Sequence, residues 1–150
     1  MEEASRALIF PEMVEIIEIN RRHLAESGHV FIPPDNLKSR GSLSWVLDTV
    51  QYPLFCYDAY PTWPEKAAQL TWIIISGHVF WDGCKRTGMS TMLYFAKLNG
   101  YESTATQDDI VAVALKIATD THYTSSDLSQ WVREKFTFRH DPRGYYGSTS

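Results

Sequence analysis

The sequence predicts an all-α protein of about six helices, with at most one small β-hairpin before the third helix. Six segments repeat apolar residues at i, i+3 and i+4, the spacing of a helix with one buried face. Most of these segments also open on a capping residue or stop at a glycine. With 44% apolar and 13% aromatic residues in 150, the chain can build one core. We therefore expect a single domain over residues 1–150, with its core between about 10 and 136.

The first two helices are predicted from their apolar faces. One is expected over 11–25, where Ile16 and Leu24 share a face and Gly28 marks the end. Ser42 is expected to cap the other. Its inward face follows i, i+3, i+4, i+7 spacing: Leu43, Val46, Leu47 and Val50.

The stretch 51–60 has no helical period and ends at Pro61, so we expect a short hairpin or an aromatic-rich flap there. Thr62 and Glu65 then have the spacing of a capping box. A third helix is therefore predicted from about Trp63 to Gly77.

The fourth helix is predicted to begin at Cys84 or the next residue and to end at Asn99-Gly100. It is apolar almost all round, which is typical of a central, buried helix. We expect Leu93 of this helix to lie in the core.

Capping pairs also open the last two helices, at Thr106 with Asp109 and at Thr124 with Asp127. Residues 138–150 show no periodicity and are expected to be a mobile tail. The inward residues are predicted to be Ile110, Val113, Ala114 and Ile117 in the fifth helix, and Leu128, Trp131, Val132 and Phe136 in the sixth.

Composition excludes several classes of protein. A formal net charge of −4 gives no general basic field, so we expect no nucleic-acid partner. No apolar run approaches about 18 residues, so no membrane span is expected. The acidic start has no signal-peptide pattern, and two cysteines, Cys56 and Cys84, make no disulfide framework. A cytoplasmic location is the expectation.

The chemistry is concentrated between the third and fourth helices, in the stretch 78–87. It holds a histidine, His78, a carboxylate, Asp82, and two adjacent cations, Lys85 and Arg86. Loops held between rigid core elements commonly carry binding and catalytic groups. This stretch is therefore the candidate functional site.

The stretch resembles the signature of the Fic/Doc family, His-x-Phe-x-Asp/Glu-Gly/Ala-Asn-Gly/Lys-Arg. The resemblance extends from about Phe10 to Glu134 and implies the helical Fic fold. Cys84 departs from the usual Asn. The matching residues are His78, Phe80, Asp82, Gly83, Lys85 and Arg86.

The resemblance implies an enzyme that moves a phosphorus-containing group from a nucleoside triphosphate, ATP by expectation, to a Ser, Thr or Tyr hydroxyl of a protein. In such a reaction His78 would be the base, since an imidazole can accept a proton near neutral pH. Asp82 would bind Mg²⁺. The implied phosphate-binding set is Gly83, Cys84, Lys85 and Arg86.

Two residues favour the Doc-like branch, a kinase branch acting on a translation elongation factor. Lys85 and Met89 stand where nucleotidyl-transferring members usually carry Gly and Arg. No inhibitory-helix motif of the Ser/Thr-x-x-x-Glu-Gly/Asn type occurs in the sequence. The resemblance thus implies a toxin acting on translation, with any antitoxin-type inhibitor on a separate chain.

Several alternatives stay open at this point. The chain could transfer AMP (AMPylation), or it could be a degenerate module that binds a nucleotide or partner, because a thiol at Cys84 replaces an amide. Cys84 could instead be a nucleophile with a depressed pKa. Tyr57 and Tyr60 could form a substrate-docking flap or a packed loop.

Overall fold

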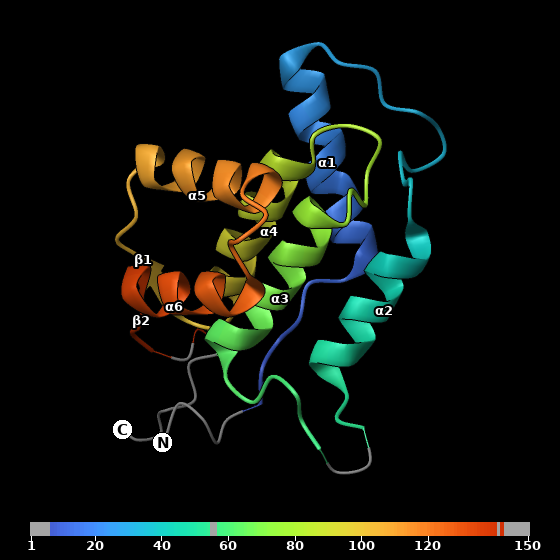
Figure 1. Ribbon diagram of the computed structural model, residues 1–150. Helices are drawn as coiled ribbons and strands as arrows, with labels where there is room; N and C mark the ends of the chain where they lie inside the picture. Colours follow the sequence, from blue (N-terminus) through green and yellow to red (C-terminus); the bar gives the residue numbers. More distant parts are fainter. Residues whose placement is uncertain (1–6, 55–56, 141, 143–150) are drawn as a thin grey trace.

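A computed structural model describes residues 7–54, 57–140 and 142 (Figure 1). Its described part contains six helices and one pair of short strands, which confirms the predicted fold class. The helices are α1 Met13–Ser27, α2 Arg40–Gln51, α3 Trp63–Ser76, α4 Cys84–Leu98, α5 Gln107–Thr119 and α6 Ser125–Lys135. The strands are β1 Tyr101–Ser103 and β2 Phe136–Phe138.

Helices α3 and α4 form the centre of the bundle. They pack against each other, with α1 and α2 on one side and α5 and α6 on the other (Figure 1). Both helices supply core residues with 0% exposed surface, among them Ala67 and Ile74 of α3 and Met92 and Phe95 of α4. The stretch between the two helices is therefore held at both ends by the core.

The predicted helix starts are confirmed where a capping box opens the helix. Thr62, Thr106 and Thr124 each accept a hydrogen bond from the backbone N–H three residues later. Helix α1 ends at Gly28, whose φ of 73° is the left-handed conformation that glycine adopts easily. Ser42 was the wrong cap for α2: the helix begins at Arg40, because Ser39 occupies the cap position and donates its hydroxyl to Ser42.

The strands do not lie where a hairpin was expected. In the described part of 51–60 there is a single bridge, between Leu54 and Tyr57, while β1 and β2 pair antiparallel with Tyr101 opposite Phe138. Phe136, predicted as the inward end of the sixth helix, begins β2 and is buried there. The predicted tail therefore starts too early at 138, and residues 141 and 143–150 lie outside the described residues.

The predicted core position of Leu93 is also wrong. Its side chain is 36% exposed, whereas Phe95 is fully buried and packs on Phe10 and Trp63 at ring-centroid distances of 5.3 and 5.6 Å. Helix α4 is thus central but has one open side, which the nearly continuous apolar pattern conceals.

Substitutions on the two sides of α4 are expected to differ in cost. Phe95→Ala should lower the free energy of unfolding by about 3–5 kcal/mol, because it leaves a cavity in the core. Leu93→Ala should cost clearly less, since its side chain already contacts solvent. Urea unfolding of the two variants measures the difference, and equal losses would contradict this assignment of the buried side.

Candidate active site

The motif loop, residues 77–83, joins α3 to α4 at the end of the bundle where α1 stops (Figure 1). Its apolar residues anchor it: Val79 and Phe80 are 0% and 1% exposed. Because these two side chains are buried, the polar residues beside them, His78 and Asp82, remain at the surface. The loop thus presents a histidine and a carboxylate from a firmly held backbone.

The segment 28–39, between α1 and α2, lies along the motif loop. The backbone N–H of Lys38 donates to the carbonyl of Val79 at 2.8 Å, and that of Trp81 donates to the carbonyl of Asn36 at 3.0 Å. A short antiparallel bridge joins the same two segments. These backbone bonds fix the loop to the segment 28–39.

Two buried asparagine side chains also bond the motif loop. The side-chain amide of Asn20, in α1, donates to the carbonyl of Asp82 at 2.9 Å and to Oγ1 of Thr87 at 3.0 Å. Its oxygen accepts a hydrogen bond from the amide of Asn36 at 2.9 Å. All three of these side chains are at most 1% exposed. None of them was among the predicted site residues.

The start of α4 has unpaired backbone donors. Gly83 takes a φ of 81°, and its own N–H donates to Oδ1 of Asp82 at 2.8 Å. The first backbone bond of the helix runs from Thr87 N–H to the Gly83 carbonyl at 2.9 Å. Within the described residues, the N–H groups of residues 84–86 have no acceptor. Such a helix start is suited to an anion.

Two cations stand on the same turn. Lys85 and Arg86 are both exposed, and the Arg86 guanidinium donates to Oγ of Ser27 at 2.9 Å and lies 3.7 Å from a carboxylate oxygen of Glu26. An exposed pair of this kind is weak, so a phosphate can replace the carboxylate at little cost.

A cavity of about 370 Å³ opens beside these cations, among α1, α4 and α5. Apolar side chains form most of its walls, including the exposed Leu93. Its volume lies within the range of about 300–1,000 Å³ usual for small-molecule sites. Cations at one end and apolar walls beyond them suit a ligand with an anionic part and a flat apolar part.

Asp82 is paired with a histidine that was not predicted to belong to the site. Nδ1 of His29 lies 3.0 Å from Oδ2 of Asp82, and both side chains are about half exposed. Within the described part of the chain, no three His, Cys, Asp or Glu side chains gather as a metal site. One carboxylate together with phosphate oxygens is nevertheless a normal ligand set for Mg²⁺.

Cys84 points into the loop. Its sulfur accepts the N–H of Phe80 at 3.4 Å and its thiol donates to the carbonyl of Phe80 at 3.2 Å. Burial raises the pKa of the Cys84 thiol. The nucleophile hypothesis requires a depressed pKa of this thiol, which is the opposite direction, so that hypothesis is wrong. The thiol closes the loop by contacting one donor and one acceptor, as an asparagine amide could.

The segment 57–60, which contains Tyr57 and Tyr60, leads into α3 at the end opposite the motif loop (Figure 1). The 14 residues of α3 separate the two ends by about 21 Å, at about 1.5 Å per residue. Tyr57 is exposed and Tyr60 packs partly on the core. The structure thus does not bring the predicted flap tyrosines to the motif, which faces the segment 28–39 instead.

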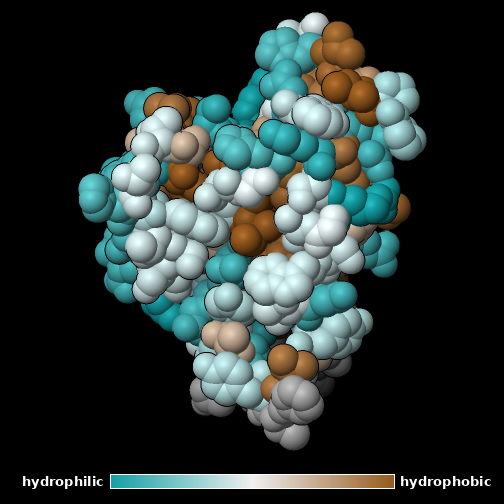
Figure 2. All heavy atoms as spheres, turned by 45° about the vertical axis from the view of Figure 1, so that its right-hand side comes forward, coloured by the Kyte–Doolittle hydropathy of each residue, from teal (hydrophilic) through white to brown (hydrophobic). Residues whose placement is uncertain are grey.

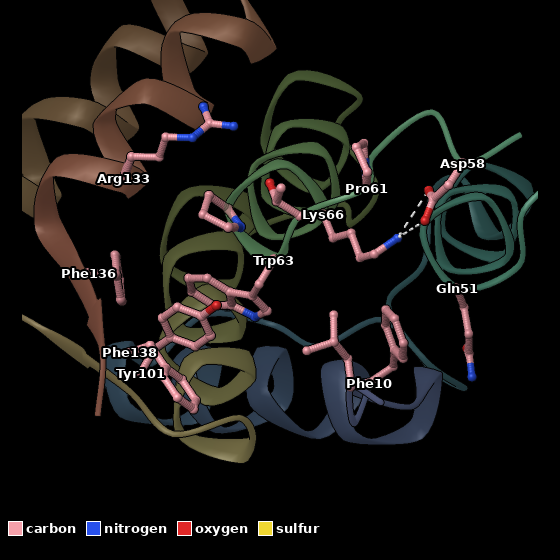
Figure 3. A pocket seen from close by; sticks show the side chains of 13 residues that line it. Phe10, Gln51, Asp58, Pro61, Trp63, Lys66, Tyr101, Arg133, Phe136 and Phe138 are labelled. Carbon is pink, nitrogen blue, oxygen red and sulfur yellow. Dashed lines mark hydrogen bonds and ion pairs between the residues drawn. The ribbon is translucent and has the colours of Figure 1, made fainter. Parts of the chain in front are cut away.

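A second cavity, of about 640 Å³, lies at this far end of α3 (Figure 3). Lys66, only 6% exposed, reaches across one side of it to Asp58 at 2.9 Å and to the carbonyl of Val50 at 2.8 Å. On the other side Trp63 stacks on Tyr101, with 4.1 Å between ring centroids. Because its buried cation is paired within the protein and the motif is at the opposite end, we do not assign this cavity to the candidate site.

The structure therefore gathers the other predicted site residues in one loop and one helical turn. These are His78, Asp82, Gly83, Cys84, Lys85 and Arg86. The imidazole of His78 is exposed and has no hydrogen-bond partner among the described residues, so it is open to a substrate.

Comparison with known families assigns the chain to a family. The model of the Fic/DOC family matches residues 12–96, more than half of the chain, from the start of α1 into α4. The chain therefore belongs to the Fic/DOC family. A search of curated proteins finds no match. None of the described helices is both long and apolar enough to cross a bilayer.

Proposed function

We propose that this protein is a Doc-like phosphotransferase that moves the γ-phosphoryl group of ATP to a hydroxyl of a protein. The observation that carries the proposal is the exposed His78 beside a helix start with three open N–H groups and two cations. Lys85 and Met89 favour this branch of the family over AMP transfer. The thiol of Cys84, which bonds the loop backbone, supports a working loop over a degenerate one.

In this proposal each group of the site has one role. His78 accepts the proton of the substrate hydroxyl, whose oxygen attacks the γ-phosphorus while the bond from that phosphorus to the β-phosphate oxygen breaks. The products are a phosphoprotein and ADP. The N–H groups of residues 84–86 and the side chains of Lys85 and Arg86 hold the phosphates. The cavity beside them receives the nucleoside.

Asp82 would hold the magnesium ion. Its carboxylate is half exposed and stands at the loop end nearest the open N–H groups, so it can share the ion with phosphate oxygens. When bound, Mg²⁺ neutralises part of the phosphate charge. The exposed pair of Asp82 with His29 offers little resistance to this exchange.

The protein substrate would bind across the motif loop and the segment 28–39. Three large side chains there are exposed, Val30 by 76%, Ile32 by 44% and Trp81 by 55%. Figure 2 shows apolar side chains gathered over the segment that follows α1. Exposed apolar groups beside a polar site are typical of a protein-binding surface. We infer a toxin-like action on a translation protein, restrained by a separate antitoxin-type chain that would cover this surface.

Labelled ATP tests the function. The purified protein is incubated with magnesium and a cell lysate, in one reaction with ATP labelled at the γ-phosphorus and in another with ATP labelled at the α-phosphorus. We expect protein-bound label from the γ-position alone. Label from the α-position would show AMP transfer instead. No transfer from either, in a protein that binds ATP, would favour a binding module.

A further inference from the structure

The carbonyl of Asp82 stands four residues before Arg86. In a helix that continued backward it would accept the Arg86 N–H. It accepts instead from the side-chain amides of Asn20, at 2.9 Å, and Asn36, at 3.4 Å. The backbone N–H of Arg86 has no acceptor within the described residues.

The carbonyl of Phe80 is also bonded by a side chain. Phe80 stands four residues before Cys84, and its carbonyl accepts from the Cys84 thiol rather than from the Cys84 N–H. Side chains thus bond two of the three carbonyl groups that stand four residues before an open N–H group of α4. These two carbonyls are directed to side chains and not to the N–H groups of the helix start.

Asn20 is well fixed in this position. It is fully buried, both hydrogens of its amide are used, and its oxygen accepts from Asn36. A β-carbon at Gly83 would lie 3.0 Å from the Asn20 amide nitrogen and 3.2 Å from a methyl of Leu24. The left-handed backbone at Gly83 and the amide of Asn20 therefore fit directly against each other.

We propose that Asn20 is a positioning residue that keeps the phosphate-binding turn of α4 open by holding the Asp82 carbonyl away from it. Through Asn36, the same amide ties that turn to the segment 28–39, on which the protein substrate would bind. The inference deepens the proposed function and rests on it for the identity of the anion. It assigns a role in phosphate binding to a side chain that does not contact the phosphates.

The chain offers a matched control for Asn20. Asn99 is also fully buried, and its side chain bonds the backbone of Ile9 at 2.8 Å and of Phe95 at 3.0 Å. It lies at the opposite end of α4 from the motif. Asn20→Ala and Asn99→Ala should both lower the melting temperature, because each removes a buried hydrogen-bonding group.

Affinity for ATP distinguishes a positioning role of Asn20 from a role in stability alone. By titration calorimetry with ATP and Mg²⁺, Asn20→Ala should bind at least about tenfold more weakly than the parent, as expected for losing a charge-assisted hydrogen bond. Asn99→Ala should bind within about twofold of the parent. Normal affinity in Asn20→Ala, or an equal loss in Asn99→Ala, would overturn the proposal. If an alanine variant does not fold, Asn20→Asp and Asn99→Asp keep the size and remove the donor.

Amide hydrogen exchange tests the same idea without a nucleotide. With Asn20 replaced, the Asp82 carbonyl is released and can accept the Arg86 N–H, so that amide should exchange more slowly than in the parent. A merely structural loss would make it exchange faster, and that result would overturn the proposal. If the parent binds no ATP, the proposed function fails, while the exchange rate at Arg86 still decides the role of Asn20.

Discussion

Replacing His78 is expected to lower protein phosphorylation by roughly 10²–10⁴-fold, the contribution of a general base, while ATP affinity changes little. In the proposed site the open N–H groups of residues 84–86 would hold the phosphates, and the substitution leaves them in place. Phosphate transfer at saturating ATP measures the first effect and calorimetry the second.

The backbone decides which variant is best for this test. His78 has a φ of 48°, a left-handed conformation that alanine adopts at a cost and asparagine tolerates better. His78→Asn therefore removes the base with less strain, and His78→Ala serves as its companion. The control is His122→Ala, which removes an imidazole with a 97% exposed side chain from the turn between α5 and α6. If the two His78 variants keep the parental rate, the base is another group.

Replacing Arg86 is expected to weaken ATP binding by roughly 10- to 100-fold. Hydrogen bonds to charged groups contribute about 1.5–3 kcal/mol, and each 1.4 kcal/mol is about tenfold in affinity. The Arg86 guanidinium bonds only exposed partners in the described chain, Ser27 and Glu26, so its loss should cost little stability. Thermal unfolding with and without Mg-ATP should show most of the ligand-induced rise in melting temperature disappear.

Lys97→Ala is the matched control for that experiment. Lys97 is also an exposed cation of α4, but it lies in the last turn of the helix. Its removal changes the net charge equally and should leave the ATP-induced shift intact. Equal shifts in Arg86→Ala and the parent would place the phosphate site elsewhere.

Local chemistry explains why the helices could be predicted well. A capping box involves two residues three apart, so Thr62 with Glu65 and Thr124 with Asp127 define helix starts regardless of the rest of the fold. The motif loop is equally local, since its histidine, carboxylate and cations follow one another between two apolar segments. The position of the strands was not local, because Tyr101 pairs with Phe138 across two intervening helices.

The apolar pattern of a helix also left it ambiguous which side chains are buried, and only the packing of the helices resolved this. Asn20 stands on the stripe of Ile16 and Leu24, at i+4 from one and i−4 from the other, and this polar residue on a buried face was the available signal of its role. Leu93 shows the reverse case, an apolar residue on an open side. Periodicity describes one helix, whereas burial depends on the neighbours of that helix.

The sequence by itself determined the six helices, the motif between α3 and α4, and the identity of the groups that would bind phosphate and accept a proton. It did so because each of these features involves residues close together in the chain. Tertiary structure alone decided that α1 supplies Asn20 to the motif, that His29 meets Asp82, and that the segment 28–39 rather than Tyr57 and Tyr60 borders the site. A hydrogen bond between residues 62 positions apart exists only after α1 has packed against the motif loop and α4, and no local pattern encodes that pairing.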